Sequence, residues 1–225
     1  MAKLILLRHG ASVWNEKNIF TGWVDIPLSA KGIQEALEAG KKIAHIPIDV
    51  IFVSSLIRAQ MTAMLAMSVH EGDQVPVVLH PGEGKLEEWA EIYSEEEKKS
   101  IIPVHVAWQI NERMYGRLQG MNKDEMRKKY GADQVQIWRR SFDVAPPEGE
   151  SLEMTAARSI PYFQEMVVPL LKQGKNVLIS AHGNSLRSIV MFLDHLSKDE
   201  VVKLEMATGA PVIYTFEGNR WTKDE

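Results

Sequence analysis

The sequence predicts an α/β fold, a three-layer sandwich in which a mostly parallel central sheet carries helices on both faces. Two observations lead to this prediction. Short apolar segments typical of strands alternate along the chain with longer segments whose apolar residues recur at helical spacing. Three of the strand-like segments, residues 3–8, 49–54 and 176–181, are continuous apolar runs, as parallel strands buried on both faces usually are.

Helical patterns separate these strands. Ser29 is a predicted N-cap, and apolar residues at helical spacing follow it to about residue 44. A longer pattern begins at Ser151 and ends at Gly174, a predicted C-cap, and Pro161 inside it is expected to kink or split the helix. Further helices are expected over residues 56–69 and 185–196.

The remaining segments are less regular. Two weaker strands, residues 74–80 and 211–217, contain prolines that favour sheet edges or strand starts. Residues 71–107 are dense in Glu and Lys, which favours a solvated, charged excursion from a single domain spanning residues 1–225; a lid or partner-binding role is the alternative. The tail after Phe216 is polar, and we expect it to be mobile.

Composition excludes several classes of protein. The net charge of the 225-residue chain is -4, so no general basic field attracts nucleic acid, and an anion site would have to gather its positive charge locally. With no cysteine, a disulfide framework, a thiolate nucleophile and a zinc–thiolate site are excluded. The first apolar run is too short for a signal peptide, and none approaches the roughly 18 residues of a membrane span. We therefore expect a cytoplasmic protein without a membrane partner.

Two of the predicted strands end in the same dipeptide. His9-Gly10 follows the first strand and His182-Gly183 follows a late one. A single histidine at a strand end is more often structural than catalytic, but the carboxyl ends of parallel strands form one rim where ligands bind. Gly10 would let the main chain approach a ligand closely. The repetition therefore predicts one functional site built from both segments.

Arginines at this rim favour phosphate over a metal ion. Arg8 precedes the first histidine, and Arg58 lies just past the end of the second strand. Their charges would repel a divalent cation, whereas a guanidinium binds phosphate bidentately, so we expect no metal site. Arg113, Arg139 and Arg140 could each form an ordinary surface ion pair instead.

These residue types together suggest phosphoryl transfer through a histidine. A histidine can act as a nucleophile and form a covalent intermediate, while arginines neutralise the oxygens of the transferring group. Glu112, in an irregular segment that also contains Trp108 and Gly116, could exchange a proton with a substrate hydroxyl, although one Glu among many is usually a solvated charge.

Motifs over nearly the whole chain resemble a known family. The sequence is similar to the cofactor-dependent phosphoglycerate mutases of the histidine phosphatase superfamily. The resemblance rests on "LLRHG", "SVWN", "FTGWVDIPLS", "NERMYG", "LQGMNK", "WRRSFD", "PPEGESL" and "SAHGNSLRS".

The resemblance implies a role for each of these residues. His9 would be the phosphorylated nucleophile, and Glu112 would be the proton donor and acceptor for the substrate hydroxyl. His182, with Arg8 and Arg58, would stabilise the transferring phosphoryl group. The implied substrate contacts are Arg8, His9, Gly10, Ala11, Ser12, Val13, Trp14, Asn15, Thr21, Gly22, Arg58, Glu112, Arg113, Met114, Tyr115, Lys123, Arg139, Arg140, Gly183 and Asn184.

The resemblance also implies an activity. The enzyme would be a glycolytic and gluconeogenic isomerase that interconverts 3-phosphoglycerate and 2-phosphoglycerate through a phosphohistidine. Its primer would be 2,3-bisphosphoglycerate, it would need no metal, and it would form a homodimer or homotetramer. A bisphosphoglycerate synthase or phosphatase of the same superfamily is the alternative. A non-catalytic phosphoprotein-binding module would be expected to have lost His9, His182 or Glu112, and all three are present.

Four features depart from the usual pattern of the family. Ala11 stands where Glu or Gln is usual, Met114 where His is commonest, and Ala207 where Pro is usual. None removes a chemical role, but Ala11 is expected to alter packing beside the first histidine. The stretch between Arg58 and Glu112 is longer than in the common short members.

Overall fold

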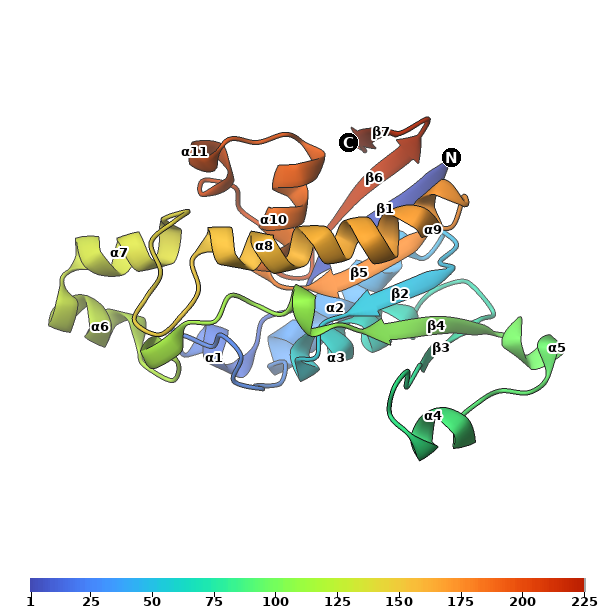
Figure 1. Cartoon of the computed structure of the whole chain (residues 1–225). Coiled ribbons are helices and arrows are strands. Elements are labelled where there is room, and N and C mark those ends of the chain that lie inside the picture. The colour runs from blue at the N-terminus through green and yellow to red at the C-terminus, as the bar shows by residue number, and fades with distance from the viewer. Residues whose placement is uncertain (225) are drawn as a thin grey trace.

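The computed structural model describes residues 1–224 and contains a seven-stranded sheet in the order β3-β4-β2-β5-β1-β6-β7 (Figure 1). The strands β1 to β5 are mutually parallel, and β6 and β7 are antiparallel to their neighbours. The predicted α/β fold with a mostly parallel sheet is confirmed. The strands are β1 (Ala2–Arg8), β2 (Val50–Val53), β3 (Val75–Val78), β4 (Ile101–Val106), β5 (Val177–Ala181), β6 (Pro211–Glu217) and β7 (Arg220–Lys223).

Helices cover both faces of this sheet. The predicted cap is present, because Ser29 Oγ accepts a hydrogen bond from the N–H of Gly32 at the start of α2. Of the described helices, none is long and apolar enough to cross a membrane. The helices are α1 (Val13–Glu16), α2 (Ala30–Ile43), α3 (Ile57–Met67), α4 (Lys85–Trp89), α5 (Glu95–Lys98), α6 (Lys123–Tyr130), α7 (Ala132–Arg140), α8 (Leu152–Tyr162), α9 (Val168–Lys172), α10 (Gly183–Leu193) and α11 (Lys198–Val201).

Alternate residues of the central strands point to opposite faces. Leu4 and Leu6 of β1 belong to the core cluster that includes residues of α10, whereas Ile5 and Leu7 belong to the cluster that includes residues of α2 and α3. All four side chains are fully buried. Burial on both faces explains why this strand is a continuous apolar run. It also holds β1 firmly in the sheet, so the residues that follow its carboxyl end have a fixed position.

The register brings the carboxyl ends of β1, β2 and β5 to one rim. The N–H of His9 donates to the carbonyl of Ala181 over 3.0 Å, and the N–H of Ser54 donates to the carbonyl of Ser180 over 3.3 Å. His182 follows directly after β5. The prediction that residues of these three strand ends share one edge of the sheet is confirmed.

The helix that contains Pro161 differs from the prediction. It does not break at the proline: α8 runs on to Tyr162 and continues through a π-helical turn, Phe163–Val167, into α9. A proline has no N–H to donate to the regular α-helical hydrogen bonds, and the wider π turn allows the helix to continue past Pro161. Gly174 ends this helical segment with φ +83°, as the predicted C-cap requires.

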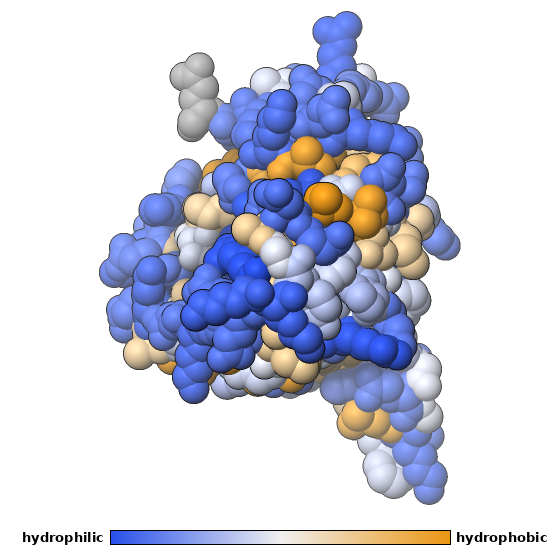
Figure 2. Space-filling view, turned by 90° about the vertical axis from the view of Figure 1, so that its left-hand side faces the viewer, coloured by the Kyte–Doolittle hydropathy of each residue, from blue (hydrophilic) through white to orange (hydrophobic). Residues whose placement is uncertain are grey.

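The predicted charged excursion, residues 71–107, is shorter in the structure than the sequence suggested. The apolar segment "IIPVHV" forms β4, and β3 pairs with it as the edge strand, so both ends of residues 71–107 belong to the sheet. Only the part between them, which includes α4 and α5, projects from the body (Figures 1 and 2). Trp89 and Tyr93 in this part are 68% and 77% exposed.

The C-terminal tail is ordered, so the expectation of a mobile tail is wrong. Residues 220–223 turn back as β7 and pair with β6. Trp221 packs against Phe216 and Phe163, with ring centroids 4.5 and 5.9 Å apart, and Asp224 accepts a hydrogen bond from Lys3 Nζ. The prediction was based on the polar composition of the tail and gave no weight to Trp221, whose packing helps to hold β7 against β6. As far as Asp224, the tail lies along the sheet.

Candidate active site

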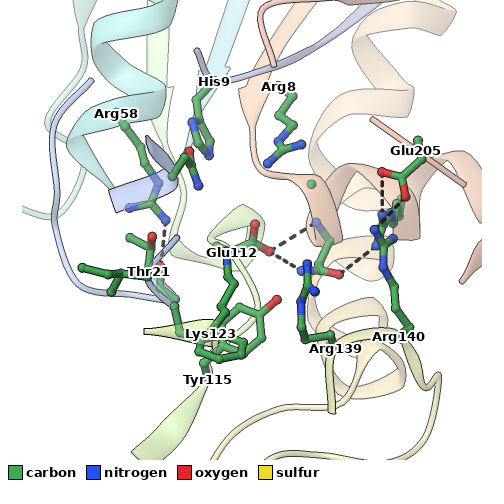
Figure 3. A pocket seen from close by; sticks show the side chains of 17 residues that line it. Arg8, His9, Thr21, Arg58, Glu112, Tyr115, Lys123, Arg139, Arg140 and Glu205 are labelled. Atoms are coloured by element: carbon green, nitrogen blue, oxygen red, sulfur yellow. Dashed lines mark hydrogen bonds and ion pairs between the residues drawn. The ribbon is translucent and has the colours of Figure 1, made fainter. Parts of the chain in front are cut away.

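A cavity of about 210 Å³ opens at the rim formed by the strand ends (Figure 3). Its lining comes from three parts of the chain: the strand ends with the loops that follow them, the segment around α6 and α7, and the loop before β6. The lining residues are Arg8, His9, Asn15, Ile19, Phe20, Thr21, Gly22, Arg58, Glu112, Tyr115, Lys123, Arg139, Arg140, Gly183, Asn184, Arg187 and Glu205.

The loop after β1 is pressed against helix α2. A Cβ atom at Gly10 would lie 2.2 Å from the carbonyl oxygen of Gly32, so only glycine permits this contact. Ala11 is buried beside it, and its N–H donates to Glu35 Oε2 over 2.7 Å. Its carbonyl accepts from both the N–H and the hydroxyl of Ser29. These contacts fix the main chain next to His9.

His9 presents one ring nitrogen to the cavity. Its Nδ1 lies 2.6 Å from the carbonyl oxygen of Gly10, which can only accept, so Nδ1 carries the proton and Nε2 keeps its lone pair. Burial, followed by the charges of Arg58 and Arg8, holds the pKa of His9 well below its ordinary value. The neutral tautomer with a free Nε2 is the form that can attack an electrophile.

His182 lies beside His9, with ring centroids 4.9 Å apart. Its Nε2 and Ser54 Oγ share a hydrogen bond of 2.7 Å, and Nδ1 is buried without a partner among the described residues. Burial, then the charge of Arg58, lowers the pKa of His182 well below its ordinary value. Ser54 Oγ already accepts from the N–H of Leu56, so its hydroxyl hydrogen is available to Nε2.

Glu112 is a buried carboxylate held by several donors. Its Oε1 accepts from the N–H of Arg113 over 2.8 Å and from the side-chain amide of Asn184 over 2.8 Å. Burial alone would raise the pKa of Glu112, but these hydrogen bonds and the charges of Arg8 and Arg58 together lower it. The carboxylate is therefore ionised at neutral pH and able to accept a proton.

Arg8 and Arg58 hold their positions through main-chain carbonyls. Arg58 is 1% exposed and donates to the carbonyls of Gly22 and Val24, and burial lowers its pKa to about 10, so it stays charged at neutral pH. Arg8 Nη1 donates to the carbonyl of Met206 over 2.6 Å, while its buried Nε has no partner within residues 1–224. Arg8 therefore keeps a donor for a ligand.

More cations line the other side of the cavity. Burial lowers the pKa values of Lys123 and Arg139, and burial together with Arg140 lowers that of Arg187 to about 10. Cations held this close repel one another, so an anion in the cavity would be attracted by several charges at once. The locally gathered positive charge that a chain of net charge -4 needs is present here.

The structure separates the predicted site residues into two groups. Those that line the cavity are Arg8, His9, Asn15, Thr21, Gly22, Arg58, Glu112, Tyr115, Lys123, Arg139, Arg140, Gly183 and Asn184. Those that are not among its lining residues are Gly10, Ala11, Ser12, Val13, Trp14, Arg113, Met114 and His182.

Two residues of the second group support the first. Arg113 is fully buried and donates from Nη2 to Tyr115 Oη and to the carbonyl of Arg139, so it positions the lining rather than forming it. Ser12 Oγ accepts from the N–H of Asn15, and Asn15 Oδ1 accepts from the N–H of Ser12. This reciprocal cap of α1 occupies both side chains within the loop.

Four lining residues were not predicted: Ile19, Phe20, Arg187 and Glu205. The signal for Arg187 is its spacing of four residues from Gly183, which places both on one face of α10; the predicted helix began only at residue 185, so this signal was missed. Glu205 lies in a loop far along the chain, and the sequence gives no signal for it. Within the described part of the chain, no group of three or more His, Asp or Glu side chains is arranged to hold a metal ion.

Comparisons with known proteins identify the family and the fold. The family described as "Histidine phosphatase superfamily (branch 1)" matches residues 4–90 and 87–225. A "2,3-bisphosphoglycerate-dependent phosphoglycerate mutase" of Protochlamydia amoebophila is 68% identical over 225 residues, covering 100% of both chains. One of the same name from Chlamydia trachomatis serovar L2b is 54% identical, covering 99% of this chain and 97% of the relative. The solved structure "Bacillus stearothermophilus YhfR" shares the fold, with TM-score 0.75, 23% identity and coverage of 99% and 95%.

Proposed function

Because the chain belongs to the histidine phosphatase superfamily and to its 2,3-bisphosphoglycerate-dependent phosphoglycerate mutases, we propose that it interconverts 3-phosphoglycerate and 2-phosphoglycerate through a phosphohistidine at His9. The observation that carries this proposal is the pairing of a free His9 Nε2 with an ionised, buried Glu112 across a cavity rich in cations.

His9 is the nucleophile of the proposed reaction. Its Nε2 takes the phosphoryl group from the substrate oxygen, so a P–O bond breaks as a P–N bond forms. The hydrogen bond from Nδ1 to the Gly10 carbonyl fixes the ring and stabilises the positive charge that it gains. Arg8 and Arg58 lie beside the ring and neutralise the oxygens of the transferring group, and the neutral His182, with its ring centroid 4.9 Å from that of His9, stabilises them by a hydrogen bond.

Glu112 exchanges the proton of the substrate hydroxyl. When a hydroxyl takes the phosphoryl group from His9, the ionised Glu112 accepts the hydroxyl proton; in the reverse transfer it returns that proton to the leaving oxygen. Asn184 and the main chain of Arg113 keep the carboxylate facing the cavity in both steps.

The residues fit a bisphosphorylated primer. Thr21 Oγ1, Arg8 Nε, Arg140 Nη1 and Arg187 Nε are buried without partners among the described residues, and each can donate to an anionic oxygen. When bound, 2,3-bisphosphoglycerate supplies the phosphoryl group that primes His9. Arg8 and Arg58 would hold one of its phosphates, and the cations around α6 and α7 would hold its other anionic groups.

An enolase-coupled assay on 3-phosphoglycerate, with and without added 2,3-bisphosphoglycerate, tests the function. We expect turnover that rises with the bisphosphate and little release of inorganic phosphate. Phosphate release that exceeds isomerisation would instead assign the chain to the phosphatases. Peptide mapping of an acid-labile, alkali-stable phosphoenzyme should locate the phosphate on His9, and another site of labelling would refute the assigned nucleophile.

Three further properties belong to the proposal. The reaction needs no metal, since the arginines beside His9 would repel a divalent cation; strong inhibition by EDTA that manganese reverses would contradict this. The protein acts in the cytoplasm. It assembles as a homodimer or homotetramer, and a monomer in sedimentation equilibrium at micromolar concentration would contradict that assembly.

A further inference from the structure

One carboxylate stands among the cations on the far side of the cavity. Glu205 lies in the loop between α11 and β6, with Oε1 2.6 Å from Arg140 Nη2 and Oε2 3.6 Å from Arg187 Nη2 (Figure 3). It lines the same cavity as His9, into which substrate anions must enter. A negative charge at this place opposes their binding, and the proposed reaction gives it no role.

The two arginines are the fixed members of this group. Arg187 lies on α10 and Arg140 ends α7, and their side chains are 10% and 28% exposed. Arg187 Nη1 is 3.5 Å from Asn184 Oδ1, which ties it to the residue that holds Glu112. Arg187 Nε and Arg140 Nη1 are buried without partners among the described residues, so the pair has donors that Glu205 does not satisfy.

Glu205 is the exchangeable member. Its side chain is 70% exposed, so water can solvate the carboxylate as soon as it leaves the arginines, and the contact is weak for that reason. The loop itself stays anchored, because the carbonyl of the next residue, Met206, accepts from Arg8 Nη1 and Met206 is buried. The Glu205 side chain can therefore turn outward without unfolding the loop.

We propose that Arg140 and Arg187 form an anion subsite which Glu205 occupies as an internal counter-ion, and that an anionic group of the phosphoglycerate ligand, away from His9, takes this subsite by displacing Glu205. The inference rests on the proposed function, and it assigns to Arg187 and Glu205 a part in selecting the ligand. A ligand with a single phosphate leaves Glu205 in place. A ligand with a second anionic group gains contacts with both arginines after the exchange.

The test compares Glu205→Gln with Glu217→Gln, which removes the same charge from an exposed position at the far end of β6. Equilibrium dissociation constants of 3-phosphoglycerate would be measured by calorimetry. We expect Glu205→Gln to tighten binding about 2-fold to 5-fold, the range of an exposed ion pair, and Glu217→Gln to leave it unchanged. Unchanged or weaker binding in Glu205→Gln would overturn the exchange, and weaker binding would show that Glu205 positions the arginines.

Two further measurements define the subsite. In Arg187→Gln, adding Glu205→Gln should no longer tighten binding; a gain of the same size there would mean that Glu205 does not act through Arg187. Glycerol 3-phosphate lacks the carboxylate. If Glu205→Gln tightens binding of 3-phosphoglycerate only, the carboxylate takes the subsite; if it tightens both ligands equally, Glu205 acts only through its charge in the cavity and the exchange is overturned.

Failure of the inference and failure of the proposed function are distinguishable. If the unmodified protein forms no phosphohistidine at His9, the proposed function fails whatever the binding data show. If the phosphohistidine forms and isomerisation proceeds while Glu205→Gln binds 3-phosphoglycerate as the unmodified protein does, only the exchange at Arg140 and Arg187 fails.

Discussion

The loops after β1 and β5 begin with the same dipeptide, yet they hold their histidines differently. The Nδ1 proton of His9 is committed to the Gly10 carbonyl, which leaves Nε2 free, whereas His182 commits Nε2 to Ser54 and leaves Nδ1 without a partner. Both rings are buried, and both have a lowered pKa. The comparison shows that the two rings differ in which nitrogen is hydrogen-bonded rather than in burial or in the direction of the pKa shift, and the proposed roles of nucleophile and supporting donor depend on this difference.

The largest expected effect is the difference between substitutions of the two histidines, His9 and His182. His9→Ala should abolish turnover and the phosphoenzyme, because it removes the ring nitrogen that keeps its lone pair at the cavity. His182→Ala should lower kcat roughly 100-fold to 1,000-fold, as loss of one oxyanion donor does, while a phosphoenzyme still forms slowly. Rapid-quench labelling with a radioactive bisphosphate measures both. Equal loss of the phosphoenzyme in the two variants would mean that the histidines do not differ in role.

The second prediction concerns Glu112, the carboxylate that is held by the segment after β5. Asn184, in the first turn of α10 and two residues after His182, donates to Glu112, so this segment orients the carboxylate that we propose as the proton acceptor. Glu112→Gln should lower kcat roughly 100-fold to 10,000-fold, the range of general acid–base catalysis, because an amide cannot take the hydroxyl proton. Steady-state kinetics and bisphosphate binding should be measured together. Normal turnover with lost binding would contradict the role of Glu112 as a base.

The two glycines give the third prediction. A Cβ at Gly10 would lie 2.2 Å from the Gly32 carbonyl, whereas a Cβ at Gly183 would lie 3.5 Å from Arg8 Nε, an ordinary contact. Gly10→Ala should lower the free energy of unfolding by about 2 kcal/mol or more through overpacking. Gly183→Ala should change it by less than about 0.5 kcal/mol. Urea denaturation monitored by tryptophan fluorescence measures both variants, and similar losses would show that α2 does not constrain the β1 loop.

The smallest effect is in the pH dependence of stability. The folded protein holds the pKa values of His9 and His182 well below the ordinary value of 6.5, so the unfolded chain binds more protons in acid. The free energy of unfolding should therefore fall as pH drops below about 6.5, by up to about 1.4 kcal/mol per pH unit for each ring, and should not depend on these rings above it. His182→Gln should reduce this slope in denaturation series at several pH values. A slope unchanged by the substitution would show that His182 is not held neutral.

Sequence reasoning found the parts of the site that follow directly from strand ends. His9, Arg58 and His182 each lie within a few residues of a buried apolar run, and the parallel arrangement brings such ends together. Glu112 was only a weak candidate from its irregular segment, and Arg139 and Arg140 were placed in the site only through the resemblance to a family. Little in the local sequence distinguishes these three residues from solvated charges. Glu205 neither follows a strand end nor belongs to a family motif.

The strand β7 and the helix around Pro161 show the same limit in the fold. The segment "EGNRWTKDE" is polar, and its one aromatic side chain orders it because it packs against Phe216 of β6 and Phe163 of the π-helical turn. Pro161 interrupts a hydrogen-bond ladder locally, but burial of the apolar face on both sides of it keeps the helix continuous through a π turn. Long-range packing decided both outcomes.

The sequence by itself determined the alternation of strands and helices, the rim where two histidines emerge, and the type of chemistry that arginine and histidine provide there. These follow from periodicity and residue type, which are local properties. Only the tertiary structure decided which nitrogen of each histidine is free, which cations reach the cavity, and that Glu205 lies on Arg140 and Arg187. Hydrogen bonds and charge contacts between residues distant in the chain depend on packing, because their energies change steeply over a few tenths of an ångström.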